Sequence, residues 1–346
     1  MRKFTSGKDT LFQWTGAISL ENRTSGVSAW RIPRDQDVLY SADLIKWAKM
    51  PAGVTINFSS DTSFLWVHGE HSLDTLPGAD IGVWDLWDVH QLTVDLFCDG
   101  KLVDSKPVAD KDSIKFGDLS NSSKEFQLWL PHLGEYIFRG ISIDSSAEIK
   151  RPSKPEKPKW ISYGDSITQG VGANKPSETW AAITALDHGY ELLSLGYGGN
   201  CHLDSMVARL IRDQDADFIS LSIGANIQIQ SSLNIRTFLP SLIGFIQIIR
   251  EKHVTTPILV ASPMYCEEAG GKANKVGLTM EAIREEVERA VKVLTDYGDP
   301  DLSYLNGTEL LGPQHSHLFP DHKHPNSEGY AVIAENIASA IPLLSK

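Results

Sequence analysis

The 346-residue chain has few cysteines, and Cys98, Cys201 and Cys266 are scattered without CxxC spacing. Such a set indicates neither a disulfide framework nor a zinc site, and reduced thiols are typical of the cytoplasm. The sequence also lacks an apolar run of membrane-spanning length and an apolar export segment near its start. We therefore expect a cytoplasmic protein, unless an export signal has been removed.

The chain also lacks a basic stripe. Its 32 Lys and Arg residues are mixed with 44 Asp and Glu residues, and the formal net charge is -12. Such a surface is a poor partner for nucleic acid or an anionic membrane, so we expect neither. The hydrophobic fraction of 41% is ordinary for a globular protein, and the length favours two domains, each with its own core.

A boundary between two domains is predicted at residues 150–159, KRPSKPEKPK, which hold three prolines and five basic residues. Before this linker, polar and apolar positions alternate as in strands; every second residue from Leu92 to Cys98 falls on one face. Asp99 and Gly100 then predict a tight turn into the next strand. Residues 1–149 are therefore predicted to form an antiparallel β-sandwich.

Tryptophan is concentrated in this first half, which holds seven of the nine, with Trp84 and Trp87 close together. Exposed aromatic rings on a β-sandwich can stack on sugars, but tryptophan in a strand is more often part of the core. We favour the core interpretation and keep a carbohydrate-binding surface as the alternative.

The second half, residues 160–346, alternates short apolar strands with helical patterns. The expected strands are KWISYGDS, ELLSLG, DFISLSIGAN, TPILVASP and SYLNG, followed by helices from Ser177, Leu203, Leu233, Thr279 and Asn326. Five such units predict an α/β domain, a parallel sheet with helices on both faces. In such a sheet, ligands bind beyond the carboxyl ends of the strands.

Ser166, in the octet YGDSITQG, stands where the first of these strands ends. Its surroundings are not the GxSxG elbow of α/β-hydrolases. Taken alone, Ser166 could be a helix N-cap that accepts an N–H from Thr168 or Gln169. A serine hydroxyl becomes a nucleophile only with a base, and that base needs a third group to fix its tautomer.

Asp321 and His324, in FPDHKHPNSEGY, offer such a pair. At this spacing in a turn, the carboxylate can hold one ring nitrogen while the other faces Ser166. Because Pro325 disfavours a helical conformation in the residue before it, we expect His324 on the loop ahead of the last helix.

Three further histidines, His315, His317 and His322, lie near this pair. An HxH pattern with a nearby aspartate could instead bind a metal, but the sequence has no HExxH motif. We favour solvated loop histidines and predict no metal and no cofactor.

Acyl transfer also needs hydrogen-bond donors for an oxyanion. Gly199, in GYGGN, can present its N–H at close range because it has no side chain, and Asn226, in GAN, can donate from its amide. Each stretch alone could be an ordinary turn. Together with Ser166 and the late Asp-x-x-His pair, they indicate a hydrolytic site.

These four blocks, in the order YGDSITQG, GYGGN, GAN and DHKHPN, resemble the SGNH or GDSL-type hydrolase superfamily. The resemblance covers about residues 160–345 and implies a flavodoxin-like three-layer α/β/α domain. It makes Ser166 the nucleophile, His324 the base and Asp321 the group that orients the base.

The same resemblance implies an oxyanion hole made by the backbone N–H groups of Ser166 and Gly199 and the side-chain amide of Asn226. One position departs from the pattern. Many members have Asp after this asparagine, whereas Ile227 stands here, so local hydrogen bonding should differ.

Residues 1–149 resemble the jelly-roll-like β-sandwich that precedes the catalytic domain of some carbohydrate esterases, through DVLYSADLIKWAKMPAGV. The whole chain is thus predicted to be a serine esterase that removes an acetyl-like group, with a saccharide or other small ester as substrate. The alternatives are a lipase or lysophospholipase and a non-catalytic carbohydrate-binding protein. Homo-oligomers are possible.

Overall fold

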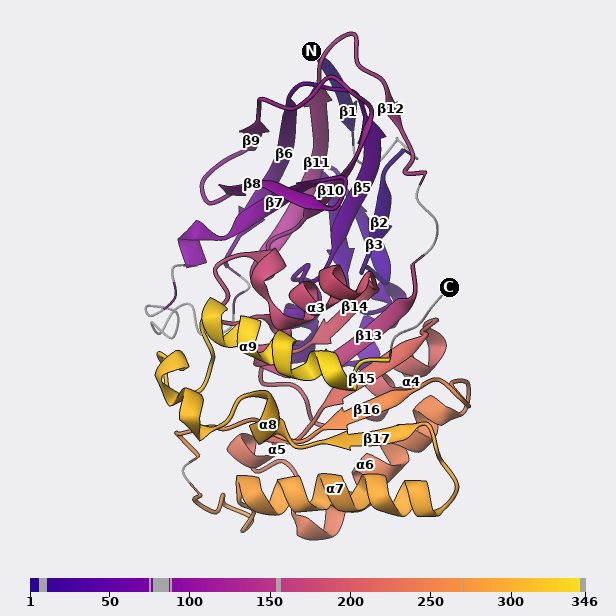
Figure 1. Cartoon of the computed structure of the whole chain (residues 1–346), viewed down its shortest axis with the longest axis vertical. Coiled ribbons are helices and arrows are strands. Elements are labelled where there is room, and N and C mark those ends of the chain that lie inside the picture. Colours follow the sequence, from indigo (N-terminus) through magenta and orange to yellow (C-terminus); the bar gives the residue numbers. More distant parts are fainter. Residues whose placement is uncertain are drawn as a thin grey trace. The chain divides into compact units, whose positions relative to one another are not determined.

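The computed structural model describes residues 1–5, 11–74, 76, 87, 89–153, 157–269 and 271–342. By its internal contacts the chain divides into two compact units, each described by itself (Figure 1). One unit is Met1–Lys157 with Ala173–Ala182, and the other is Pro158–Gly172 with Ile183–Lys346. The domain boundaries expected at residues 149 and 160 stay a prediction. They place residues 173–182 in the C-terminal domain, whereas the internal contacts group these residues with the N-terminal half.

The N-terminal unit contains two antiparallel sheets. One has the order β3-β4-β11-β6-β9, with β1 on β11: β1 (Arg2–Thr5), β3 (Ser19–Arg23), β4 (Gly26–Trp30), β6 (Leu65–Ser72), β9 (Ser113–Phe116) and β11 (Glu135–Ile143). The other has the order β12-β5-β10-β7-β8, with β2 on β5: β2 (Gln13–Thr15), β5 (Thr55–Ser60), β7 (Thr93–Cys98), β8 (Lys101–Pro107), β10 (Lys124–Trp129) and β12 (Ile149–Lys150). The helices are η1 (Arg34–Leu39), α1 (Ala42–Ala48), η3 (Val89–Gln91) and η4 (Pro176–Glu178).

Both sheets contribute side chains to one core, which is rich in phenylalanine. Phe58 of β5 stacks on Phe126 of β10 with ring centroids 5.0 Å apart, and Phe12 meets Phe138 of β11 edge to face at 5.4 Å. The predicted turn is also present, because Asp99 and Gly100 have φ angles of 50° and 80° between β7 and β8. The antiparallel fold expected for this half is confirmed.

The tryptophans of residues 1–149 are mostly covered. The buried ones are Trp30, Trp47 and Trp129, and the half-buried ones are Trp14, Trp66 and Trp87. Trp84 lies outside the described residues. The core interpretation is therefore confirmed for the three buried tryptophans.

A buried carboxylate explains why residues 173–182 group with this unit. Asp95 on β7 is fully buried, and it accepts hydrogen bonds from Ser177 N–H at 3.2 Å and from Ser177 Oγ–H at 2.6 Å. Thr93 Oγ donates a third at 2.7 Å. Because a buried carboxylate is costly without such donors, Ser177 is held firmly against β7.

The C-terminal unit has a five-stranded sheet of order β14-β13-β15-β16-β17, and the pairs between neighbouring strands are parallel. The strands are β13 (Lys159–Gly164), β14 (Glu191–Gly196), β15 (Phe218–Ser222), β16 (Ile258–Ala261) and β17 (Leu302–Leu305). The helices are α2 (Ser166–Gln169), α3 (Trp180–His188, whose first three residues group with the other unit), α4 (Ser205–Asp213), α5 (Ala225–Gln230), α6 (Ile235–Arg250), α7 (Met280–Asp296), α8 (Gly307–Leu310), η5 (Pro313–Leu318), α9 (Ser327–Ile337) and η6 (Ala338–Ala340).

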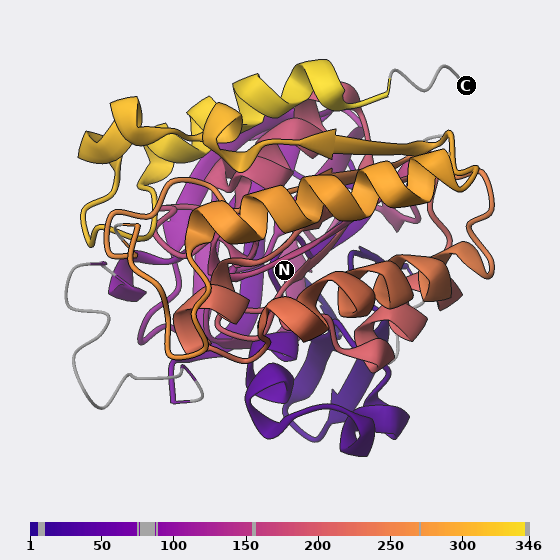
Figure 2. The same cartoon turned by 90° about the horizontal axis from the view of Figure 1, so that it is seen from below.

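Helices cover both faces of this sheet. The helices α4, α6 and α7 pack side by side, and α9 lies on the opposite face of the sheet from α7 (Figure 2). Thr279 and Asn326, the expected starts of two helices, are N-caps whose side chains accept N–H bonds from Ala282 and Gly329 at 3.0 Å each. The three-layer α/β/α fold is confirmed.

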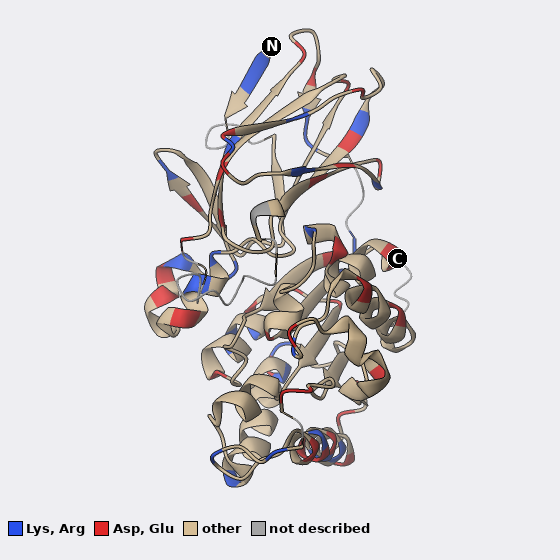
Figure 3. Ribbon diagram, turned by 90° about the vertical axis from the view of Figure 1, so that its left-hand side faces the viewer, with Lys and Arg blue, Asp and Glu red and all other residues tan. Residues whose placement is uncertain are grey.

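Charges of both signs are mixed in the view of Figure 3. Within the described part of the chain, no helix is long and apolar enough to span a membrane.

Candidate active site

The end of β13 presents Ser166 at the carboxyl edge of the parallel sheet. Asp165 is the N-cap of α2, because its Oδ1 accepts a hydrogen bond from Ile167 N–H at 2.9 Å. The alternative in which Ser166 caps the helix is therefore wrong. The preceding Gly164 is needed for close packing, since a β-carbon there would lie 2.2 Å from Thr168 Oγ. Ser166 is the first helical residue, and its hydroxyl is available for another partner.

That partner is His324. Ser166 Oγ lies 2.8 Å from His324 Nε2, and His324 Nδ1 lies 2.6 Å from Asp321 Oδ2. The other oxygen of Asp321 accepts the backbone N–H groups of His324 at 2.6 Å and Lys323 at 3.0 Å. The carboxylate thus fixes the Nδ1–H tautomer, and Nε2 is left to accept the serine proton. Ser166 from the first block thus lies beside Asp321 and His324 from the last block, as predicted.

The pKa values of the two carboxyl groups near the ring are shifted in opposite directions. Burial alone would raise the pKa of Asp321, but hydrogen bonds from the His324 ring and from the backbone of His324 and Lys323 hold it below its ordinary value. At Asp165, burial raises the pKa, although N–H groups and the charge of His324 act in the opposite direction. Asp321, which is hydrogen-bonded to the ring and has the lowered pKa, is therefore the carboxyl group whose geometry suits stabilisation of a protonated ring.

Asn226, the second residue of α5, is oriented by a residue that sequence reasoning did not include in the site. The backbone N–H of Cys201 donates to Asn226 Oδ1 at 3.0 Å, which directs the amide NH₂ away from Cys201. Burial raises the pKa of the Cys201 thiol well above its usual range, which disfavours the reactive thiolate. No side-chain pattern could have revealed a role performed by its backbone.

Gly199 adopts a left-handed conformation with φ of 66°. Its carbonyl accepts hydrogen bonds from His202 Nε2 at 2.9 Å and from Gln230 Nε2, so the loop is held in place. Ser166 and Asn226 line the same cleft, whereas Gly199 is not among the described residues that line it. Ile227, which follows Asn226, is fully buried.

The cleft beside Ser166 is bounded by the ends of β13, β15 and β16. Its wall is largely apolar, with Ile167, Ile223, Ile229, Met264 and Tyr265 among the lining residues. The space beside Ser166 is small, with room for only a few waters. This cleft suits a small apolar group next to the serine.

The three further histidines differ in their surroundings: His317 and His322 are exposed, whereas Nδ1 of His315 is buried and has no hydrogen-bond partner in the described part of the chain, so this nitrogen is not solvated as expected. His322 Nδ1 lies 2.9 Å from Glu267 Oε2, and His315 and His317 belong to η5. Among the residues that the structure describes, no cluster of three or more His, Cys, Asp or Glu side chains could hold a metal ion.

Comparison with protein families assigns the chain to a class of enzyme. Residues 156–341 match the GDSL-like Lipase/Acylhydrolase family, and residues 12–139 match the N-terminal domain of SsfX3. The chain therefore belongs to the GDSL-like lipase/acylhydrolase family and is an ester hydrolase of the SGNH type. No curated protein sequence matched it.

Solved structures extend this likeness to nearly the whole chain. The salicylyl-acyltransferase SsfX3 from a tetracycline biosynthetic pathway is 31% identical, with a TM-score of 0.87 over 97% of this chain and 95% of that one. A GDSL-like lipase from Bacteroides ovatus is 23% identical, with a TM-score of 0.78 over 95% and 94%. A family two carbohydrate esterase from Clostridium thermocellum, in complex with cellohexaose, is 15% identical, with a TM-score of 0.66 over 95% and 98%. The last two show the fold alone.

Proposed function

We propose that this enzyme is a serine esterase that removes a short acyl group from a small-molecule or saccharide ester. The observation that carries the proposal is the hydrogen-bonded series from Ser166 Oγ through His324 to Asp321, with distances of 2.8 and 2.6 Å. Such a series is what activation of a serine hydroxyl requires.

In the first half of the reaction, Ser166 Oγ attacks the ester carbonyl carbon while its proton moves to His324 Nε2. The oxyanion that forms accepts hydrogen bonds from the side-chain amide of Asn226 and, as the family resemblance implies, from the N–H groups of Ser166 and Gly199. The C–O bond to the alcohol then breaks, and the alcohol leaves with the proton from His324. Asp321 stabilises the protonated ring throughout.

In the second half, water attacks the acyl-enzyme. His324 takes a proton from the water, and the new tetrahedral intermediate collapses. The Ser166 ester bond breaks, the proton on His324 returns to Oγ, and the carboxylic acid leaves. The free enzyme is restored, so the cycle needs no metal or cofactor.

The small apolar cleft supports a short acyl group. Because the space beside Ser166 has room for only a few waters, it suits an acetyl group better than a long acyl chain. A saccharide as the alcohol part follows from the resemblance of residues 1–149 to the sandwich of carbohydrate esterases. A lipase or lysophospholipase is disfavoured by the same small volume.

Acyl transfer to an alcohol acceptor is a second candidate, favoured by the 31% identity with a salicylyl-acyltransferase over 97% of the chain. The acyl-enzyme is the same in both reactions, and only the second nucleophile differs. Chromatography of products formed from p-nitrophenyl acetate or p-nitrophenyl salicylate with added alcohols separates the two. Free acid as the main product supports the esterase, and a transferred ester supports the alternative.

The main test compares Ser166→Ala with Ser205→Ala on p-nitrophenyl acetate and a panel of acetylated sugars. Both serines are the first residue of a helix, but Ser205 is exposed and starts α4. We expect Ser166→Ala to lower kcat by about 10⁴-fold or more, as removal of a nucleophile does in other serine enzymes. Ser205→Ala should keep wild-type activity. Undiminished hydrolysis by Ser166→Ala would overturn the mechanism.

A further inference from the structure

The loop that follows β16 forms one wall of the cleft beside Ser166. Pro263, Met264, Tyr265 and Cys266 are consecutive residues of this loop, and all four line the cleft. The loop belongs to none of the four sequence blocks, so what holds it in place determines the shape of the acyl-binding space.

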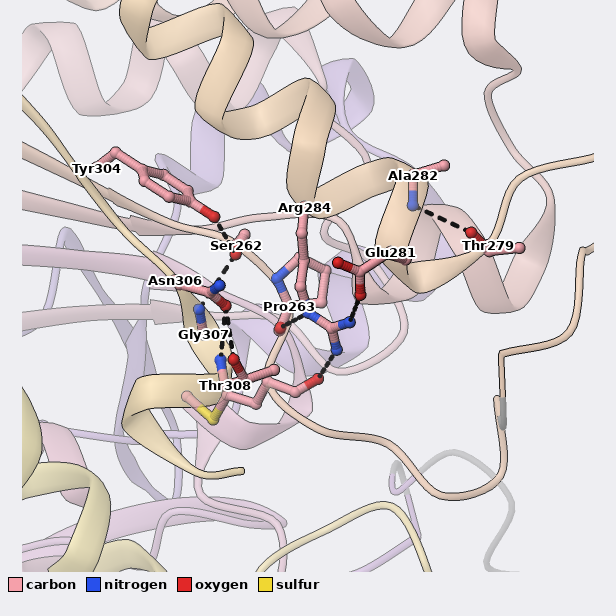
Figure 4. Close-up of polar contacts among 11 residues, drawn as sticks. Ser262, Pro263, Thr279, Glu281, Ala282, Arg284, Tyr304, Asn306, Gly307 and Thr308 are labelled. Carbon is pink, nitrogen blue, oxygen red and sulfur yellow. Dashed lines mark hydrogen bonds and ion pairs between the residues drawn. The ribbon is translucent and has the colours of Figure 1, made fainter. Parts of the chain in front are cut away.

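Arg284 of α7 holds the backbone of this wall without lining the cleft itself. Its Nε donates to the Pro263 carbonyl at 2.9 Å, and its Nη2 donates to the Met264 carbonyl at 3.0 Å (Figure 4). The side chain is only 11% exposed, so these bonds lie largely out of solvent. A planar guanidinium that binds two successive carbonyls fixes both the place and the orientation of the peptide between them.

The third partner of Arg284 is of another kind. Its Nη1 lies 3.0 Å from Glu281 Oε2, one turn away on the same helix, and the Glu281 side chain is 71% exposed. Because Glu281 is largely in solvent, this ion pair contributes little. The contacts that matter for the cleft are therefore the two bonds to carbonyls.

The wall is also packed closely against the turn that carries Asn226. Gly224 has φ of 119°, and a β-carbon there would lie 2.9 Å from the Pro263 ring and 2.4 Å from Ile283. Ile283 and Arg284 are neighbours on α7, so this helix contacts the turn through one residue and the wall through the next. A shift of Pro263 would thus change the space around the Gly224 turn and around the wall of the cleft.

On its other side the loop is fixed to the start of α8. Ser262 Oγ accepts the Gly307 N–H at 3.1 Å and lies 3.1 Å from the Tyr304 hydroxyl (Figure 4). A β-carbon on Gly307 would lie 2.1 Å from the Ser262 carbonyl. One end of the wall is therefore immobile by packing, and Arg284 holds the part that faces the acyl group.

We infer that Arg284 is a positioning residue that sets acyl-group selectivity by holding the Pro263 and Met264 carbonyls, and with them the wall of the cleft. This inference rests on the proposed esterase function. Without Arg284 the wall moves outward, and esters with larger acyl groups are accepted relative to acetyl esters.

The test measures kcat/KM for p-nitrophenyl acetate and p-nitrophenyl hexanoate in Arg284→Met, Arg284→Lys and Glu281→Gln. Met fills much of the volume of Arg but cannot donate, and Lys keeps the charge but cannot bind both carbonyls in a plane. We expect the ratio of kcat/KM for acetate to kcat/KM for hexanoate to fall about tenfold in Arg284→Met and by less in Arg284→Lys. A change of about tenfold is within the range that a single contact in a substrate pocket contributes to selectivity. Glu281→Gln, which keeps both carbonyl bonds, should retain the wild-type ratio.

Amide hydrogen exchange of the peptide 262–266 gives a readout that does not need activity. Exchange should be faster in Arg284→Met than in Glu281→Gln. An unchanged ester ratio in both Arg284 variants, with wild-type activity intact, would overturn this inference alone. Absence of any esterase activity in the wild type would instead count against the proposed function, and the inference would fall with it. If Arg284→Met does not fold, Arg284→Lys decides by the same ratio.

Discussion

The N-terminal unit has two antiparallel sheets with a core rich in phenylalanine, whereas the C-terminal unit has one parallel sheet. In antiparallel sheets, the loops that follow successive strands alternate between the two ends. In the parallel sheet, the ends of β13, β15 and β16 meet at one edge, and their loops line one cleft. Topology alone therefore concentrates the polar site in one unit, and the other unit is organised around an apolar core.

The largest expected effect separates the two units by activity. Asp321→Asn keeps the shape of the side chain, but it removes the charge that stabilises the protonated His324 ring. We expect kcat to fall about 10⁴-fold, as the same change does in another serine enzyme. Asp144→Asn in the N-terminal unit is the control, because its carboxylate accepts hydrogen bonds from Ser63 and Thr62, far in the sequence from the predicted catalytic residues. Equal activity of both variants would contradict the assignment of the chemistry to the parallel sheet.

The next effect is on stability. Phe58 is fully buried in the aromatic core, so Phe58→Ala should lower the free energy of unfolding by about 3–5 kcal/mol. Urea denaturation followed by fluorescence measures this loss. In buffer without urea, kcat should stay within about twofold of wild type. A large loss of kcat in folded Phe58→Ala would show that the two regions are not separable in this way.

A pair of asparagines sharpens the comparison. Asn226→Ala removes a donor to the oxyanion and should lower kcat by about 10²–10³-fold with KM little changed. Asn57→Ala removes amide bonds to Gln13 O at 3.2 Å and Thr55 Oγ at 3.0 Å in the N-terminal unit. Asn57→Ala should cost about 1 kcal/mol of stability and leave kcat unchanged. Steady-state kinetics of both variants decide whether the roles differ as stated.

The smallest effect concerns pH. The hydrogen bond from His322 to Glu267 raises the pKa of His322 above its usual value. Its contribution to stability is therefore full below about pH 6.5 and is lost as pH rises through the raised pKa. Glu267→Gln should unfold at a lower temperature than wild type at about pH 6, and the difference should vanish at alkaline pH. The ion pair is largely exposed, so this shift should be the weakest of the four.

The parallel sheet and the meeting of Ser166, Asp321 and His324 could be predicted from the sequence. Apolar strands alternating with helical patterns determine the sheet, and the carboxyl ends of such strands share one edge. Residues far apart in the chain therefore come together without any long-range signal in the sequence itself. The antiparallel half followed from its period of two in the same way.

Other parts of the site were beyond such reasoning. Cys201 orients Asn226 through its backbone N–H, and every residue except proline has one, so its side chain carries no signal. Arg284 lies on a helix with regular charge spacing, where an arginine is ordinarily solvated. Ser177 was expected to start a helix, but its contact with Asp95 depends on burial of a carboxylate that looks like any other strand aspartate. These roles depend on distances that only the folded chain defines.

The separation of Ser166 and His324 by 158 residues bears on how the enzyme comes into being. At roughly 5–20 residues per second, a ribosome needs about 8–30 s to make the chain between them. During that interval the nascent chain carries a serine without its base, so it cannot hydrolyse esters. Hydrolytic activity should therefore begin only after His324 has left the ribosome, however early the β-sheets form.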